Sequence, residues 1–323
     1  DAEGFNHRPV SVMSVIARFS GYALMLLISA FIVLPFVWMF LSSVKDNNEI
    51  FVVPVQWFPK TWHWEHYLQI WSKADMWRWL LNTLFFAVVV TFLQVFTGSF
   101  AAYGFSKIDF PGRNTLFLIY VATMAVPWQT YMIPQFKMLS LAGLNDTRWS
   151  IILLQAFGAF GVFMMKQFYD TIPNELSEAA RLDGMSEFGI YLRIMLPLSG
   201  PSIAALSIIT FTNTWNDYMG PLLYLRSPEL YTIQLGLKTF ISQYDADYAM
   251  IMTGSVLSVL PILIVFLLGQ KQFIEGIATS GMKGVGHERS HFTRRRLFFT
   301  VEGVFPIVDA VYVMLALSVC VLM

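Results

Sequence analysis

The near-continuous apolar run over residues 21–41 decides the environment in which this chain folds. About 20 consecutive apolar residues are enough for a helix to cross the hydrocarbon core of a bilayer. Only 13% of the residues are charged, whereas soluble domains carry about a quarter. The sequence therefore predicts an all-α polytopic membrane protein with six spanning helices, over residues 21–41, 79–105, 115–134, 149–168, 201–224 and 248–268.

Local signals modify this pattern in two places. Pro127 and Pro134 fall in the third run and predict a kink or a break there. The segment 42–78 is too polar to span and is rich in tryptophan, which favours the membrane–water interface. We expect an ordered loop on the membrane face that carries Trp57, Trp62, Trp64, Trp71 and Trp77.

The polar passage 170–197, between two apolar runs, has the grammar of a helix–turn–helix elbow. We predict one helix over 174–183 and a stop at Gly184, because glycine is the preferred residue just after a helix. Ser186 caps a second helix, which Pro197 bends or ends near residue 196. A short elbow of this kind is suited to docking in a groove on another protein.

This passage closely resembles the EAA loop of ABC importer permeases, through Glu178-Ala179-Ala180, Asp183-Gly184 and Leu196-Pro197. Other segments look like those of the carbohydrate-uptake, maltose-type permease subfamily: Ala101 to Lys107, Trp215-Asn216-Asp217 and Lys283-Gly284. The resemblance covers about residues 10–284. It implies the six-helix core of a type I ABC importer permease.

The resemblance also suggests how the chain is divided. Residues 1–78 hold an N-terminal segment, the first helix and an external loop, and residues 79–270 hold a permease core of five helices. Residues 271–284 form a cytoplasmic exit segment, and residues 285–323 form an atypical tail. Three alternatives stay open for the apolar part of that tail: a tilted seventh span, an interfacial helix, or a segment unrelated to the core.

As the resemblance has it, the elbow is the coupling helix of the permease and sits in a cleft of a cytoplasmic ATPase. Glu178 then faces a basic residue of the ATPase, and Ala179 and Ala180 allow close approach. Gly184 makes the turn, which a residue with a Cβ does not make cheaply, and Asp183 beside it is a further coupling residue. Closure of two ATPases would rock the spans between inward-facing and outward-facing states.

The implied partners are a second homologous permease, two ATP-binding cassette ATPase subunits, an extracellular solute-binding protein and membrane lipid. The implied location is the plasma (inner) membrane of a bacterium or archaeon, with several passes. The chain has no G-x-x-x-x-G-K-[ST] phosphate loop, so ATP would be used by the partner ATPase and this chain would bind no cofactor. A formal net charge of zero gives no sign of a nucleic-acid partner.

Polar and aromatic residues cluster in the fifth span, where ionisable groups tend to line cavities. Amides, a carboxylate and aromatic rings suit sugars, because rings stack on CH groups and polar groups bind hydroxyls. The candidate substrate pathway is Asn213, Trp215, Asn216, Asp217 and Tyr218. The alternative is structural, with Asp217 at a helix end and Trp215 in an interface belt. Hydrogen bonding between helices is the alternative for the further cavity candidates, which are Gln94, Thr97, Ser99, Gln129, Gln135 and Gln155.

The most specific competing motif is His287-Glu288-Arg289-Ser290-His291, which matches the H-E-x-x-H signature of zinc metalloproteases. Flanking glycines and a following arginine run do not indicate a rigid active-site helix. We therefore expect no catalytic or metal-binding residue, and a permease subunit of an ATP-driven sugar or oligosaccharide importer. The alternatives are a membrane zinc protease, a permease of the same class for another solute, and a stand-alone secondary transporter.

Overall fold

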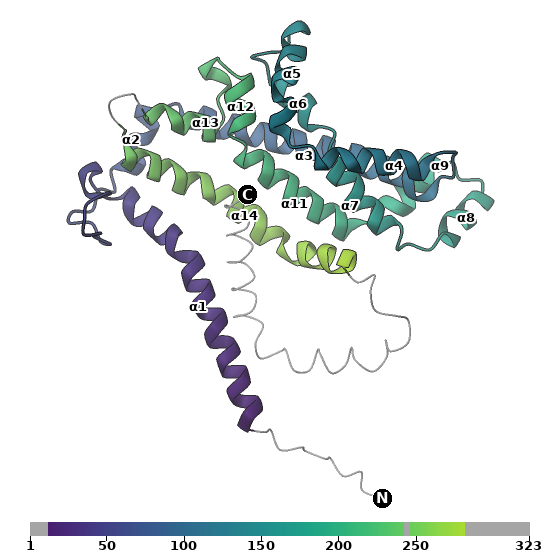
Figure 1. Cartoon of the computed structure of the whole chain (residues 1–323), viewed down its shortest axis with the longest axis horizontal. Coiled ribbons are helices and arrows are strands. Elements are labelled where there is room, and N and C mark those ends of the chain that lie inside the picture. Colours follow the sequence, from purple (N-terminus) through teal and green to yellow (C-terminus); the bar gives the residue numbers. More distant parts are fainter. Residues whose placement is uncertain (1–11, 242–245, 282–323) are drawn as a thin grey trace, which may run out of the picture. The chain divides into compact units, whose positions relative to one another are not determined.

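A computed structural model describes residues 12–241 and 246–281, with side chains described over 19–241 and 246–271. The tail 285–323 and the zinc-protease motif at 287–291 lie outside these residues. The described residues up to Met39 belong to one compact unit, and those from Phe40 onward belong to a second. Figure 1 gives the course of the chain and the helix labels.

Long apolar helices dominate the described residues. Four helical segments of the described residues are long and apolar enough to cross a membrane. They are Phe19–Ser43 in α1 (Val12–Ser43), Met76–Lys107 (α3), Arg148–Tyr169, and Tyr248–Lys271 in α14 (Tyr248–Gly281). The third of them consists of α6 (Arg148–Gln155) and α7 (Ala159–Tyr169). Two further candidates are bent pairs of helices, so the described residues hold up to 6 spans. The all-α membrane class is confirmed, and six spans result when each bent pair counts as one.

The first bent pair lies where prolines predicted it. α4 (Arg113–Ala122) with η2 (Thr123–Ala125) meets α5 (Trp128–Leu141) at 99°, and Pro127 precedes the first residue of α5 in an extended conformation. Pro134 lies inside α5 without ending it. The break therefore belongs to Pro127 alone.

The second bent pair joins residues 187–198 to α11, and a further break, between α11 and α12, changes the predicted fifth span. α11 (Gly200–Asn216) stops before Asp217, which is extended, and α12 (Met219–Tyr224) is a separate short helix. A single span over 201–224 was thus a wrong prediction. The last helix differs as well: α14 continues without a break through residue 271 to Gly281.

The second unit is built around four long helices. α11 packs against both α3 and α14, and α3 also packs against α7. A Cβ on Gly98 of α3 would lie 3.3 Å from the backbone of Gly161 in α7, so glycine lets these two helices approach closely. The outer face of α3 leaves apolar side chains exposed for lipid, among them Leu84, Val88 and Phe92.

Short elements cap this bundle at its two ends (Figure 1). One end carries α2 (His66–Lys73), α12 and α13 (Ile233–Leu237), with the one-turn helices η1 (Asn47–Glu49), η4 (Pro228–Leu230) and η5 (Lys238–Phe240). The opposite end carries α8 (Glu175–Leu182) and α9 (Glu187–Ile190). Side chains of α3 fix the first end: Thr83 Oγ1 accepts from Ile233 N at 2.8 Å, and Asn82 Nδ2 donates to Glu229 O at 2.8 Å.

The predicted tryptophan-rich loop is ordered. Trp62 and Trp64 stack with ring centroids 5.7 Å apart, and Trp71 lies 6.5 Å from Trp77 at the start of α3. All four of these side chains remain exposed. Their position beside the first turn of a spanning helix suits an interfacial loop, which stays a prediction.

Candidate functional site

The elbow forms as two helices joined by a glycine turn. Gly184 has a φ of +81°, and Met185 N donates to Ala180 O at 3.0 Å while Gly184 N donates to Arg181 O at 3.0 Å. This pair of hydrogen bonds satisfies the last carbonyls of α8. Ser186 Oγ then accepts from Gly189 N at 3.2 Å and caps the next helix. The predicted glycine stop and serine cap are both present.

The second helix of the elbow runs further than the sequence suggested. After α9, residues Tyr191–Met195 form a π-helical turn (η3), and α10 (Leu196–Leu198) follows. Leu196 N donates to Tyr191 O, which is the hydrogen-bond spacing of a π-helix, and Pro197 is the next residue. The helix therefore passes through Pro197, and the 80° bend into α11 falls after Leu198.

The predicted coupling residues divide between an exposed and a buried face. Glu178, Ala179, Asp183 and Gly184 are exposed, and the neighbouring Leu182 is 90% exposed. Ala180 is only 5% exposed and packs inward. The two alanines therefore do not share one surface: Ala179 remains available to a partner, whereas Ala180 belongs to the core of this chain.

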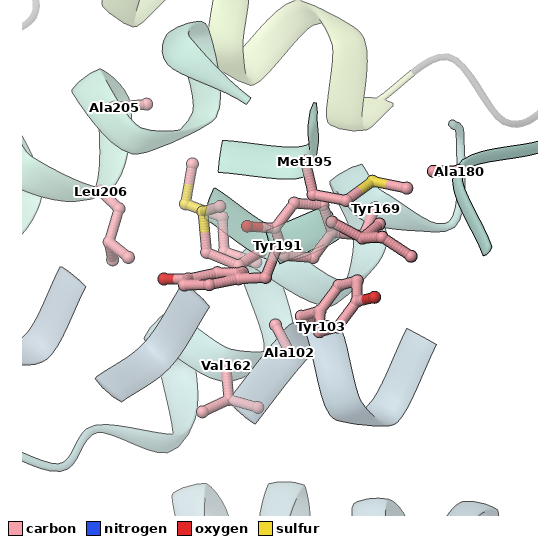
Figure 2. Close-up of a cluster of buried hydrophobic side chains, with 12 residues drawn as sticks. Ala102, Tyr103, Val162, Tyr169, Ala180, Tyr191, Met195, Ala205 and Leu206 are labelled. Carbon is pink, nitrogen blue, oxygen red and sulfur yellow. The ribbon is translucent and has the colours of Figure 1, made fainter. Parts of the chain in front are cut away.

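Figure 2 shows the core beneath the elbow, with Ala180 at its edge and the rings of Tyr103, Tyr169 and Tyr191 beside Met195. Tyr103 comes from α3, Tyr169 from the end of α7, and Tyr191 from the elbow itself. The elbow is thus packed on two spanning helices rather than suspended from a loose loop.

A polar network holds the two arms of the elbow to the end of α3. Arg181 Nε lies 2.5 Å from Glu187 Oε1, and Arg181 Nη2 donates to Lys107 O at 3.1 Å. Tyr103 Oη donates to Glu187 Oε2 at 2.6 Å. Sequence reasoning did not find this network, although the resemblance of Ala101 to Lys107 to a family segment pointed at two of its members.

Lys107 extends the network to the segment that leads into α8. Its Nζ donates to Ile172 O at 2.6 Å and to Asn174 Oδ1 at 2.8 Å. Beside it, Asp170 accepts from Ser106 Oγ at 2.8 Å and from Lys166 Nζ at 2.9 Å. These hydrogen bonds connect the segment before α8 to both α3 and α7.

The predicted pathway residues lie near the other end of α11, around a cavity of about 720 Å³. Asn213, Asn216, Asp217 and Tyr218 all line it. Trp215 does not: it is 1% exposed, its Nε1 donates to Ser258 O of α14 at 3.0 Å, and its ring stacks on Phe211. The other lining residues come from α3, α5, α6, α11, α12 and the α6–α7 break: Val90, Gln94, Trp128, Tyr131, Leu154, Gln155, Phe157, Thr210, Thr214 and Met219.

Two glutamines of the cavity also join helices. Gln155 Nε2 donates to Asp217 Oδ2 at 2.7 Å, and Thr214 Oγ1 donates to Gln155 Oε1 at 3.2 Å. Thr210 Oγ1 donates to Gln94 Oε1 at 2.6 Å. The two interpretations of these glutamines, cavity lining and hydrogen bonding between helices, therefore hold together.

Glycines make room for this polar cluster. A Cβ on Gly220 would lie 2.4 Å from Asp217 Oδ2, and a Cβ on Gly158 would lie 2.1 Å from Gln94 Nε2. Gly220 N also donates to Asp217 Oδ1 at 3.0 Å. Sequence reasoning missed both glycines: the contact of Gly220 is local to Asp217, whereas that of Gly158 appears only when the start of α7 is placed beside Gln94 of α3.

A second cavity of about 330 Å³ adjoins the first and shares Trp128, Tyr131, Gln155 and Asp217 with it. Gln135 lines this one, and its Oε1 accepts from Trp128 Nε1 at 3.0 Å and from Tyr224 Oη at 2.8 Å. Each of the two cavities falls in the size range of small-molecule sites.

Side chains able to bind a metal ion do not gather into a site in the described residues. The described part of the chain contains no group of three or more His, Cys, Asp or Glu side chains placed to hold a metal ion. His63 and His66 stack 5.5 Å apart, and His63 Nδ1 lies 2.7 Å from Glu65 Oε1, whose hydrogen bond raises the pKa of His63. These two histidines belong to the ordered loop.

A membrane-embedded helical unit with an exposed elbow at one end and a polar cavity at the other defines a transport subunit. The family described as "Binding-protein-dependent transport system inner membrane component" matches residues 94–273. The chain belongs to that family. It is accordingly a multi-pass membrane permease subunit rather than an enzyme, and its class operates with an ATPase and a solute-binding protein.

Named relatives and a solved structure agree with this assignment. The arabinooligosaccharides transport system permease protein AraQ of Bacillus subtilis (strain 168) is 34% identical over 275 residues, covering 83% of this chain and 98% of the relative. The diacetylchitobiose uptake system permease protein NgcG of Streptomyces coelicolor is 29% identical over 265 residues, covering 81% and 87%. A crystal structure of a bacterial ABC transporter that imports the acidic polysaccharide alginate has a chain with a TM-score of 0.72 and 23% identity, covering 82% of this chain and 99% of that one.

Proposed function

We propose that this chain is one of two permease subunits in an ATP-driven importer of a sugar or oligosaccharide. Its relatives named for arabinooligosaccharide transport and diacetylchitobiose uptake support the substrate class. We place it in the plasma (inner) membrane of a bacterium or archaeon, with a homologous permease, two ATPases and an extracellular binding protein. The observation that carries the proposal is the exposed elbow surface, whose buried side is attached to α3 and α7.

In this proposal the elbow receives the motion of the ATPase. Glu178 is exposed and makes no ion pair with the described part of the chain, so its carboxylate is available to a basic residue of the ATPase. Leu182, at 90% exposure, and Ala179 supply an apolar contact beside it. A mixed patch of this kind gains from burial of apolar area and from a charge pair at its edge.

The stroke then travels along helices. The elbow leads through the 80° bend into α11, and its network ties it to the end of α3. α11 and α3 both line the cavity at the other end. Rigid-body displacement of the elbow therefore moves two walls of the cavity at once, which is how ATPase closure opens and shuts the pathway.

Co-purification of an ATPase tests the proposal. The tagged chain, solubilised with its partner permease, is expected to retain the ATPase, and Glu178→Arg is expected to lower the recovered ATPase at least about tenfold, or about 1.4 kcal/mol. The matched control is Glu229→Arg, the same charge reversal on an exposed glutamate of η4 at the opposite end of the bundle. His287→Ala is expected to leave recovery unchanged.

Two results would count against the proposal. One is intact protein that retains no ATPase, and the other is equal loss in Glu178→Arg and Glu229→Arg. Uptake by the reconstituted importer over a panel of oligosaccharides and non-sugar solutes tests the substrate class separately. Transport of a non-sugar solute alone would leave the coupling in place and reject the sugar.

A further inference from the structure

The two adjoining cavities have few charged groups in their lining. Asp217 is the only acid among their lining residues, and those lining residues include no lysine, arginine or histidine. Arginines on nearby elements are turned to other partners: Arg148 lies over the ring of Phe85 at 4.8 Å, and Arg226 lies over Phe136 at 5.9 Å. The described residues that line the hollow therefore offer an anion no countercharge.

Apart from Asp217, the lining has no charged side chain and suits hydroxyls and CH groups. Trp128, Tyr131, Phe157 and Tyr218 supply aromatic surface, and Tyr131 is 41% exposed. Asn213 is exposed into the cavity, and its amide makes no hydrogen bond with the part of the chain that the structure describes. An amide both donates and accepts, so Asn213 can bind a hydroxyl in either role.

Asp217 is held in place rather than free to move toward a ligand. Its two oxygens accept from Gln155 Nε2 at 2.7 Å and from Gly220 N at 3.0 Å. A ligand carboxylate entering this hollow would approach a fixed carboxylate and lose water without gaining a cation. Burying an unpaired charge in this way is strongly unfavourable.

We infer that this cavity is a contact site for uncharged saccharides and that it discriminates against uronates. The inference rests on the proposed function and deepens it by naming the substrate class that this chain accepts. Similarity of the whole chain does not fix the charge of a site, since the 32% identical permease protein YtcP of Bacillus subtilis is named for polygalacturonan and rhamnogalacturonan transport, and the transporter involved in alginate import shares the fold at 23% identity.

Binding to the assembled complex tests the inference. The permease–ATPase complex is placed in nanodiscs without the binding protein, so that only the membrane site is measured. The probes are two matched pairs, galactotriose with trigalacturonate and cellotriose with its uronate counterpart, which differ in the group at C6. At least one neutral trisaccharide is expected to bind about tenfold or more tightly than its uronate, a difference of about 1.4 kcal/mol.

Variants locate the effect on this chain. Asn213→Lys introduces a cation at an exposed side chain that makes no hydrogen bond with the described residues. It is expected to raise uronate affinity about tenfold and so to reduce the preference for the neutral sugar over the uronate. Tyr131→Leu is expected to weaken neutral binding about fivefold or more through loss of ring stacking. The matched control is Tyr248→Leu, because Tyr248 is 39% exposed and lies outside both cavities.

The outcomes separate this inference from the proposed function. Equal or tighter binding of the uronates overturns it, and so does binding of neither sugar, or equal loss in Tyr131→Leu and Tyr248→Leu. In each of these cases the ATPase would still be recovered with the complex, because recovery depends on the elbow. Loss of the ATPase from intact protein would instead reject the proposed function.

Discussion

Gly184 is the residue whose backbone most constrains the elbow. Its φ of +81° lies in the left-handed region, which costs a residue with a Cβ about 1–2 kcal/mol. A Cβ there would meet nothing within 4 Å, so the cost of substitution is conformational rather than steric. We predict that Gly184→Ala lowers transport per ATP hydrolysed by about three- to tenfold in the reconstituted importer, with α8 still folded.

Two controls make this prediction specific. Gly184→Asn is expected to retain most coupling, because asparagine tolerates the left-handed region better than alanine. Gly200→Ala adds a Cβ to another glycine with open space and no positive φ, and it is expected to leave coupling unchanged. If Gly184→Ala and Gly200→Ala behaved alike, backbone conformation at the turn would not matter.

Asp146 fastens the loop between α5 and α6 to the loop after α12. Its Oδ1 accepts from Arg226 N at 2.8 Å and Ser227 N at 2.9 Å, and its Oδ2 accepts from Ser227 Oγ. These hydrogen bonds, that of the Ser227 side chain foremost, lower the pKa of Asp146. The ionised form thus stabilises the fold above about pH 4, and this contribution is lost as the pH falls through the folded-state pKa.

We therefore predict that Asp146→Asn lowers the apparent melting temperature at pH 7 and has a smaller effect near pH 3.5. The difference at pH 7 corresponds to about 1 kcal/mol, allowing for the partial exposure of the site. Asparagine suits the φ of 58° at this position, so the variant tests the charge and not the backbone. Asp109→Asn, at a side chain that is 95% exposed, should change little at either pH. A constant difference across this pH range would exclude the ionised carboxylate as the cause.

For single residues, the sequence predicted which residues belong to each site better than it predicted which way their side chains point. The Glu178, Asp183 and Gly184 surface and the Asn213, Asn216, Asp217 and Tyr218 cluster were all named from the sequence, and the structure exposes the first and lines a cavity with the second. Ala180 and Trp215 point inward instead. Neighbours on a helix face different ways, and which face meets the core depends on packing that a local motif does not encode.

At the scale of elements, the ion pair between Arg181 and Glu187 joins the two arms of the elbow. Their side chains are 37% and 43% exposed, so the pair alone contributes no more than about 1 kcal/mol. The pair acts mainly to position the elbow, because Tyr103 and the Lys107 carbonyl attach the same two side chains to α3. We predict that Glu187→Gln leaves the ATPase bound and lowers transport per ATP about twofold to fivefold.

A charge swap distinguishes positioning from general instability. Arg181→Glu combined with Glu187→Arg restores the attraction but not the bonds to α3, so coupling should recover only in part. Asp247→Asn breaks the Lys73–Asp247 pair at the other end of the bundle, where the side chains are 47% and 36% exposed, and it should not alter coupling. Full coupling in Glu187→Gln would show that the pair has no role in transmission.

The elements themselves were predictable where the signal was local. Apolar runs located the spans, Pro127 located one break, and glycine and serine marked the elbow turn. The end of α11 at Asn216 also had a local signal, because Gly220-Pro221 follows closely and such a pair interrupts helices, but the predicted span ran across it. The contact that could not be predicted is that of Asp217 with Gln155, which comes from a distant part of the chain.

At the scale of the whole bundle, α11 links the elbow to the cavity. Its 17 residues span about 25 Å at 1.5 Å per residue, which is too far for the two sites to contact each other directly. Communication between them must therefore take the form of a shared change in helix position. Thermodynamic linkage then requires that nucleotide changes saccharide affinity by the same factor as saccharide changes nucleotide affinity.

We predict that this coupling factor and the intrinsic affinities respond to different residues. Glu178→Ala should bring the coupling factor closer to one. It should leave the saccharide affinity in the absence of nucleotide unchanged, because no residue of the elbow lines the cavity. Asn213→Ala should weaken saccharide binding about fivefold, the effect of about one hydrogen bond, and leave the factor intact. Titrations of the nanodisc complex with each ligand in the presence and absence of the other measure all of these quantities. Because the sites are distant and share no partner, the effects of the two substitutions on binding should add within about 0.5 kcal/mol. A weaker saccharide affinity in nucleotide-free Glu178→Ala would instead mean that the elbow shapes the cavity even at rest, and that α11 does not act as a rigid link.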